Sequence, residues 1–75
     1  MLNKTNTIMA KEKYTLVGVD GNAYAVMAYV RRAMQNEGFS KKEQDDYIAA
    51  ATSGNYDNLL VTSLEMIDEC NLRAR

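Results

Sequence analysis

The chain has 75 residues, with nine Lys and Arg against ten Asp and Glu, no histidine and a formal net charge of −1. This length allows one small domain, and the balanced charge argues against binding of nucleic acid or a membrane through a basic face. Cys70 is the single cysteine, which excludes an internal disulfide and, with no histidine, disfavours a closed zinc site. We therefore expect no metal and no cofactor. The lone thiol and the lack of an apolar run long enough to cross a bilayer favour a cytoplasmic protein.

The chain divides into three expected parts. Residues 1–12 are polar and lack hydrophobic periodicity, which predicts a flexible tail, with Thr5–Ala10 as a candidate second short strand. Residues 13–72 carry the patterned segments and form the expected compact domain. Residues 73–75 are expected to be a C-terminal tail.

The first predicted element is a strand at Lys13–Val19, whose sequence KYTLVGV is rich in β-branched and aromatic residues. A single strand leaves backbone N–H and C=O groups unpaired, and nothing downstream is typical of a second strand. Its partner must then be the Thr5–Ala10 segment or the same strand of another copy. The sequence therefore predicts a homo-oligomer.

A helix follows from Asn22, whose side chain is a good N-cap. Gly38 ends this helix at the C′ position, and Phe39 can fold back on the last turn as in a Schellman motif. One continuous apolar face is predicted for the helix, formed by Ala23, Val26, Met27, Val30 and Met34.

Two further helices are predicted. Ser40 and Glu43 form a capping box that opens the second helix, and Asn55 caps the third after a break at Gly54. The apolar stripe of the second helix is Tyr47, Ile48 and Ala51. The predicted buried face of the third helix is Tyr56, Leu59, Leu60, Leu64 and Ile67. The predicted fold is thus mainly α, a small single domain of order β-α-α-α.

Two turns place a Gly-Asn pair directly before a helix, in DGNAYA (20–25) and SGNYDN (53–58). Two helix N-termini with free backbone amides could together hold the phosphate of a nucleotide. Arg31 and Arg32 would reach such a site only from a neighbouring subunit. Helix capping alone also explains both turns, in which we expect Gly21 and Gly54 to be required through positive φ. The candidate ligand-binding residues are Asp20, Gly21, Asn22, Gly54, Asn55, Arg31 and Arg32.

Candidate protein-interface residues come from the predicted strand and from tyrosines off the main stripe of the first helix. They are Tyr14, Leu16, Val17, Tyr24 and Tyr29. A DNA-binding helix-turn-helix is disfavoured, because Asp45 and Asp46 follow the lysines of the second helix and the third helix is acidic. Catalysis requires a positioned acid, base or nucleophile, and Cys70 lies near a helix C-terminus, which raises a thiol pKa. We therefore predict that the chain is not an enzyme.

Three segments, LVGVDGNAYAVM, GFSKKE and ATSGNYDNLL, resemble a recurrent group of short proteins of phages, plasmids and bacterial genomes. The shared blocks are D-G-N-A-[YF] and A-T-S-G-x-Y-D-x-L-L, and the resemblance covers Tyr14 to about Asn71. It brings no catalytic residues, and it implies a small mobile-element protein that binds a host or phage protein, such as a host defence component. The first functional hypothesis is therefore a non-enzymatic protein-binding module. The alternative is an oligomeric binder of a nucleotide or phosphate at the Gly-Asn helix starts.

Overall fold

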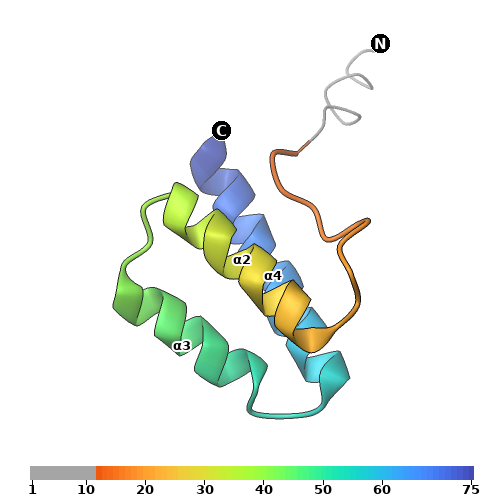
Figure 1. The fold of residues 1–75 in the computed structure, drawn as a ribbon. Coiled ribbons are helices and arrows are strands. Elements are labelled where there is room, and N and C mark those ends of the chain that lie inside the picture. Colours follow the sequence, from red (N-terminus) through yellow and green to blue (C-terminus); the bar gives the residue numbers. More distant parts are fainter. Residues whose placement is uncertain (1–11) are drawn as a thin grey trace.

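The computed structural model describes residues 12–75, which form three helices joined by short turns (Figure 1). Helix α2 spans Ala23–Asn36, α3 spans Lys41–Ala51 and α4 spans Tyr56–Ala74. The three helices pack against one another, and α4 contacts both α2 and α3. The helical part of the predicted fold is therefore confirmed.

The ends of the chain differ from the predicted division. Helix α4 continues to Ala74, so Arg73 and Ala74 belong to the helix and not to a C-terminal tail. The predicted N-terminal tail falls on residues 1–11, outside the described residues, except for Glu12. The carboxylate of Glu12 accepts a hydrogen bond from the guanidinium of Arg75 at 2.7 Å, which brings the two ends of the described chain together.

Each helix begins at a polar side chain that caps its backbone, as the sequence predicts. The Asn22 side chain accepts hydrogen bonds from two backbone N–H groups of the first turn of α2. Ser40 and Glu43 form the reciprocal capping box of α3, with Oγ and Oε1 each bonded to the other residue's backbone N–H. The Asn55 side chain caps α4 by accepting from the N–H of Asn58 at 3.0 Å. Local sequence thus fixes where all three helices start.

Helix α2 ends in the predicted Schellman motif. Gly38 has φ +83°, a conformation that costs little only for glycine. The Phe39 N–H donates to the Met34 carbonyl at 3.0 Å, and the Gly38 N–H donates to the Gln35 carbonyl at 3.1 Å. These are the two bonds of the motif, and they turn the chain sharply into α3.

The segment predicted as a strand, Lys13–Val19, is irregular, and residues 12–75 contain no strand. We call residues 12–22 the N-terminal strap. A reverse turn interrupts it, in which the Val19 N–H donates to the Leu16 carbonyl at 3.1 Å and Gly18 adopts φ +86°. The Thr5–Ala10 segment lies outside the described residues, and pairing of Lys13–Val19 with another copy of the chain stays a prediction.

The strap finds side-chain partners for its backbone in place of a second strand. The side-chain amide of Asn71 accepts from the Tyr14 N–H at 2.9 Å and donates to the Tyr14 carbonyl at 3.0 Å. The Thr15 N–H donates to the hydroxyl of Tyr29 at 3.0 Å. Backbone pairing to another copy is therefore not needed at these positions, and the apolar side chains of the strap pack against helices.

The core lies where α2, α3 and α4 meet. Its fully or nearly buried hydrophobic residues include Tyr14, Val26, Val30, Met34, Phe39, Tyr47, Ala51, Leu59, Ile67 and Cys70. The apolar faces predicted for α2 and α3 are largely those observed. On α4, by contrast, Leu59 and Ile67 are buried but Leu64 and Tyr56 are exposed, so part of its predicted buried face is wrong.

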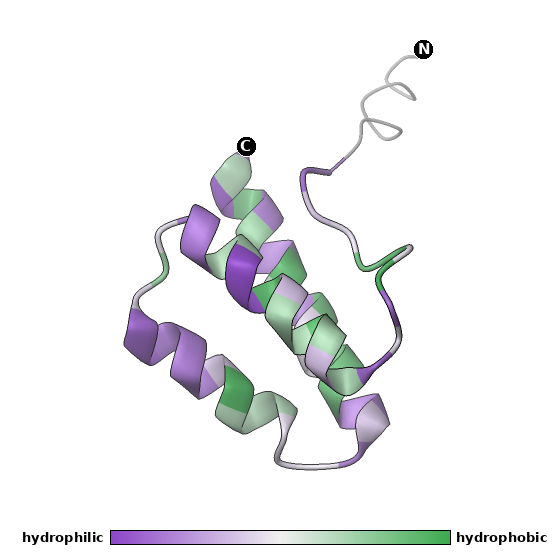
Figure 2. Cartoon of the chain, in the orientation of Figure 1, coloured by the Kyte–Doolittle hydropathy of each residue, from purple (hydrophilic) through white to green (hydrophobic). Residues whose placement is uncertain are grey.

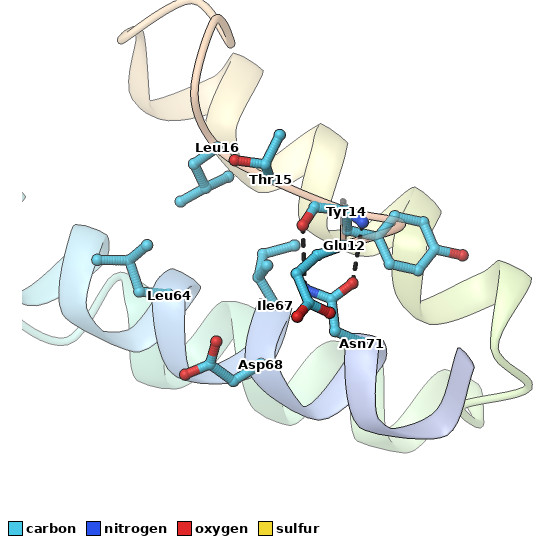
Figure 3. A pocket seen from close by; sticks show the side chains of 8 residues that line it. All are labelled: Glu12, Tyr14, Thr15, Leu16, Leu64, Ile67, Asp68 and Asn71. Carbon is cyan, nitrogen blue, oxygen red and sulfur yellow. Dashed lines mark hydrogen bonds between the residues drawn. The ribbon is translucent and has the colours of Figure 1, made fainter. Parts of the chain in front are cut away.

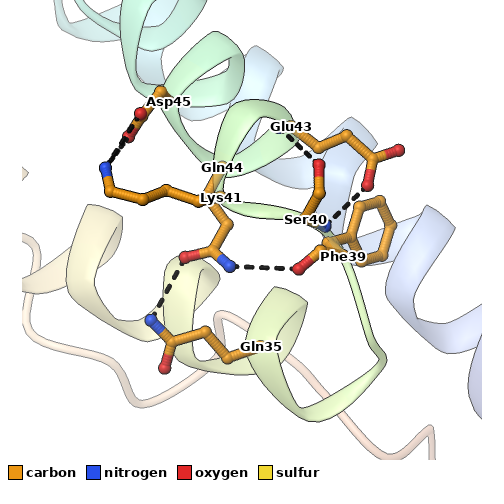
Figure 4. Close-up of polar contacts among 7 residues, drawn as sticks. All are labelled: Gln35, Phe39, Ser40, Lys41, Glu43, Gln44 and Asp45. Carbon is orange, nitrogen blue, oxygen red and sulfur yellow. Dashed lines mark hydrogen bonds and ion pairs between the residues drawn. The ribbon is translucent and has the colours of Figure 1, made fainter.

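Polar side chains within the core are hydrogen-bonded. Gln44 donates to the Phe39 carbonyl at 3.1 Å and accepts from Gln35 at 3.1 Å, which links α2 to the start of α3 (Figure 4). The hydroxyls of Tyr47 and Ser63 lie 2.6 Å apart and join α3 to α4. Figure 2 shows that the beginning of α3 is strongly hydrophilic, consistent with its exposed lysines and carboxylates.

Candidate functional site

The two Gly-Asn turns lie close together in space. The hydroxyl of Tyr56, at the start of α4, donates a hydrogen bond to the carbonyl of Gly21, just before α2. A cleft of about 340 Å³ lies beside this contact, with Tyr24, Met27 and Leu59 among its lining residues. The structure therefore brings Asp20, Gly21 and Asn22 near Gly54 and Asn55, as the anion-binding hypothesis requires.

Several backbone amides at these helix starts are already bonded to capping side chains. Asn22 Oδ1 accepts from the N–H groups of Tyr24 and Ala25, at 2.8 and 3.3 Å. Asp20 Oδ1 accepts from the Asn22 N–H at 2.9 Å, which places a carboxylate beside the turn. A phosphate would have to displace these bonds and approach a negative charge, so the geometry favours capping over anion binding.

The two arginines of the hypothesis lie elsewhere in the molecule. Arg31 and Arg32 line a separate shallow depression on α2, together with Ala28 and Gln35. Within one chain they do not face the Gly-Asn turns. Nucleotide binding that uses them from a neighbouring subunit stays a prediction.

The expected positive φ at Gly21 and Gly54 is wrong, since the glycines with positive φ in the described residues are Gly18 and Gly38. Gly54 is constrained in another way. A Cβ atom there would lie 3.1 Å from Cβ of Asn58, closer than ordinary packing allows. At Gly21 the nearest atom to such a Cβ would be the Tyr56 hydroxyl at 3.4 Å, an ordinary contact.

The predicted interface residues separate into internal and exposed ones. Tyr14 is 7% exposed and its hydroxyl donates to the carboxylate of Glu37, while Tyr29 is half-buried against the strap. Leu16 is partly buried on the core. Val17 and Tyr24 are 87% and 80% exposed, so these two are accessible to a partner.

The titratable groups with shifted pKa values have structural explanations. Hydrogen bonds from Tyr14 and Lys13 lower the pKa of Glu37. The bond from the backbone of Ser40 lowers the pKa of Glu43, which belongs to the capping box. Burial raises the pKa of the Cys70 thiol, and the negative charge of Glu37 raises it further. These groups stabilise the strap, a helix cap and the core.

The most distinctive surface of the described chain is the outward side of α4. Val61, Leu64 and Leu72 are 55%, 51% and 58% exposed, although a small domain normally turns such side chains inward. Their spacing of three and eight residues puts them on one side of the helix. Three exposed carboxylates lie on the same side, and together these six residues define the outer face of α4: Val61, Leu64, Glu65, Asp68, Glu69 and Leu72.

A groove borders the outer face of α4 on each side. The strap groove, of about 440 Å³, lies between the strap and α4 and has Leu16, Leu64 and Ile67 as apolar lining residues (Figure 3). Figure 3 shows the Asn71 side chain bonded to the backbone of Tyr14 at one end of this groove. The second groove, of about 300 Å³, lies between α3 and α4.

This second groove, called the acidic groove below, has an apolar floor and a negatively charged rim. Its floor includes Tyr47 and Met66. The rim is formed by Glu43, Asp46, Glu65 and Glu69. The outer face of α4 is therefore the centre of a wider surface that combines aliphatic contact area with carboxylates.

Residues 12–75 contain no helix long and apolar enough to span a membrane, and no group of three or more His, Cys, Asp or Glu side chains placed to hold a metal ion. Comparison of the chain with protein-family models, with curated proteins and with solved structures finds no match. Functional inference accordingly rests on the residues and their geometry.

Sequence reasoning missed the outer face of α4, although a signal for it exists. The apolar residues of the third helix cover more of its circumference than one buried stripe needs, since Val61 and Leu72 fall outside the predicted buried face. Such an excess indicates a second apolar surface. Because Leu64 is predicted to belong to the buried face, this second apolar surface is not predicted.

Proposed function

We propose that this chain is a non-enzymatic protein-binding module that contacts its partner through the outer face of α4. The observation that carries the proposal is the exposure of more than half of Val61, Leu64 and Leu72 on one side of one helix. Single exposed aliphatic residues are ordinary, but aligned ones that adjoin grooves are typical of interaction surfaces.

The distribution of the chemistry-bearing groups supports a binding role over catalysis. Active sites collect groups of shifted pKa in one pocket, where they can act on a substrate together. Here Glu37, Glu43 and Cys70 lie in a strap contact, a helix cap and the core. Each has a structural partner or is buried among apolar residues.

We further propose that the partner is a protein of a bacterial host or of a phage. This part of the proposal comes from the sequence resemblance of the Gly-Asn blocks to short phage and plasmid proteins, and the lysate experiment below tests it.

Affinity capture from a bacterial lysate tests the proposal when surface variants are compared. Leu64→Glu puts a charge in the centre of the outer face of α4, and we expect it to abolish capture of a discrete polypeptide. Val17→Glu is the matched control, because it adds the same charge at an exposed aliphatic residue outside both grooves. Both variants should keep the parent's thermal unfolding midpoint.

The control also tests Val17 as a predicted interface residue. Capture that survives Leu64→Glu but fails in Val17→Glu would assign the contact to the strap and contradict the proposal. The same comparison with Tyr24→Ala tests whether the cleft beside α2 takes part.

A further inference from the structure

The outer face of α4 carries three carboxylates that form no ion pair with the cations of residues 12–75. In the described part of the chain, five ion pairs occupy the cations near the termini and on α3. None of these pairs includes Glu65, Asp68 or Glu69. Among residues 12–75, the surface therefore presents three exposed carboxylates that form no ion pair.

The adjoining grooves hold further carboxylates, but those carry cationic partners. Glu12 at the strap groove pairs with Arg75, and Glu43 and Asp46 at the acidic groove pair with Arg73 and Lys42. Within the described chain, Asp68, Glu65 and Glu69 therefore carry the unpaired negative charge of this surface.

Asp68 lies toward the strap groove, and Glu65 and Glu69 lie toward the acidic groove. A ligand on this surface therefore meets the exposed aliphatic side chains together with these unpaired carboxylates on either side. Exposed charges of one sign attract a partner of the opposite sign and orient it.

We propose that the outer face of α4 binds a basic amphipathic helix of the partner protein; this rests on the proposed function and specifies its partner. The partner's leucine-type side chains pack on Val61, Leu64 and Leu72, and its Lys and Arg side chains pair with the flanking carboxylates. Helix α4 has 19 residues, which is about 28 Å of helix, long enough to support a partner helix of several turns.

A second copy of this chain fits the same surface poorly. A two-fold interface through the outer face of α4 would bring Glu65, Asp68 and Glu69 of one copy against the same carboxylates of the other. Like charges facing each other at an interface oppose association. An anionic membrane is disfavoured for the same reason, because it would meet the carboxylates with its own negative charge.

The probe for this proposal is a fluorescently labelled synthetic peptide of about five helical turns, with leucines on one face and lysines on the other. The matched peptide has glutamate in place of every lysine. Fluorescence anisotropy with the full chain should show binding of the lysine peptide at least about tenfold tighter than the glutamate peptide. Raising the ionic strength from about 0.05 to about 0.5 M should weaken it, since exposed charge pairs are screened.

Variants locate the binding on the surface. The combined change Glu65→Gln, Asp68→Asn and Glu69→Gln should weaken the lysine peptide about tenfold, as three exposed charge pairs would. The single change Glu69→Gln should weaken it measurably, whereas Asp45→Asn should not. Asp45 pairs with Lys41 on α3 and lines neither groove, so this control loses the same charge elsewhere.

Three results would overturn the proposal: equal affinity for both peptides, no effect of the triple variant, or an equal effect of Asp45→Asn. Concentration-dependent dimerisation of the protein alone that Leu64→Glu abolishes would assign the surface to a second copy, and binding to anionic vesicles lost in the same variant would assign it to a membrane. Lysate capture that depends on Leu64 but not on the three carboxylates would leave the protein-binding function standing and refute the basic partner.

Discussion

At the scale of single residues, Asn71 has a structural role that the sequence pattern does not predict. Its side chain is buried and bonds to both backbone groups of Tyr14, as the next strand of a sheet would. It therefore holds the strap on α4 and forms one end of the strap groove.

Replacing Asn71 should destabilise the protein strongly. Asn71→Ala leaves the buried N–H and C=O of Tyr14 without partners, and we expect a loss of about 2–4 kcal/mol in the free energy of unfolding, measured in urea. Asn71→Asp keeps the acceptor and loses the donor, so it should fall between the parent and the alanine variant. A loss below about 0.5 kcal/mol for Asn71→Ala would show that the strap is not held by these bonds.

Glu37 makes the strap contact depend on pH. The Tyr14 hydroxyl and the Lys13 ammonium bond to its carboxylate and hold its pKa below the ordinary value of 4.5. A carboxyl whose pKa is lowered in the folded state contributes stability above its unfolded pKa and loses it as the pH falls through the folded pKa. Glu37→Gln should therefore be less stable than the parent at neutral pH, and the difference should shrink below about pH 4. Urea unfolding at both pH values measures this, and a difference independent of pH contradicts it.

At the scale of the helices, the sequence predicts starts and ends well because the determining contacts are local. The caps at Asn22, Ser40 and Asn55 each join residues two or three positions apart, so the pattern is complete within a short segment. The strap differs from its predicted strand because its backbone partner, Asn71, lies 57 positions away from Tyr14. β-Branched and aromatic residues favour strands, but they can also pack on the side of a helix pair. In the strap, the side-chain amide of Asn71 makes the backbone hydrogen bonds that a neighbouring strand would otherwise make.

The two types of glycine should respond differently to alanine. Gly38→Ala places a Cβ on a residue with φ +83° and should cost about 1–2 kcal/mol in the free energy of unfolding. Gly21→Ala is the control, because Gly21 does not have positive φ and a Cβ there makes only an ordinary contact. Equal losses in the two variants would contradict the Schellman account of the end of α2.

The cap at Asn22 gives a further prediction. Asn22→Asp preserves the oxygen that accepts from Tyr24 and Ala25 and adds a negative charge at a helix N-terminus. The free energy of unfolding should stay within about 0.5 kcal/mol of the parent, with Asp20 nearby limiting any gain. We also expect no nucleotide to bind the parent. Saturable nucleotide binding that Asn22→Asp abolishes would instead support an anion site at the Gly-Asn turns.

At the scale of the whole molecule, the candidate site was the hardest feature to predict. Whether an apolar residue of α4 is buried depends on how many other elements pack around that helix. The hydrophobic periodicity of the helix does not predict how many elements surround it. Leu59 and Ile67 are buried in the core, whereas Leu64 is half exposed at the strap groove, on a side of α4 that the short strap leaves partly open. The pattern of the two Gly-Asn turns suggests an anion site, but their asparagine side chains cap α2 and α4.

Site-specific photocrosslinking tests the central claim most directly. A photoreactive phenylalanine analogue is placed at Leu64, on the outer face of α4, and in a second protein at Asp45, an exposed position on α3 outside both grooves. We predict that illumination in a bacterial lysate yields a discrete crosslinked product from position 64 and none from position 45. A product from position 45 with none from position 64 would contradict a protein-binding surface on α4.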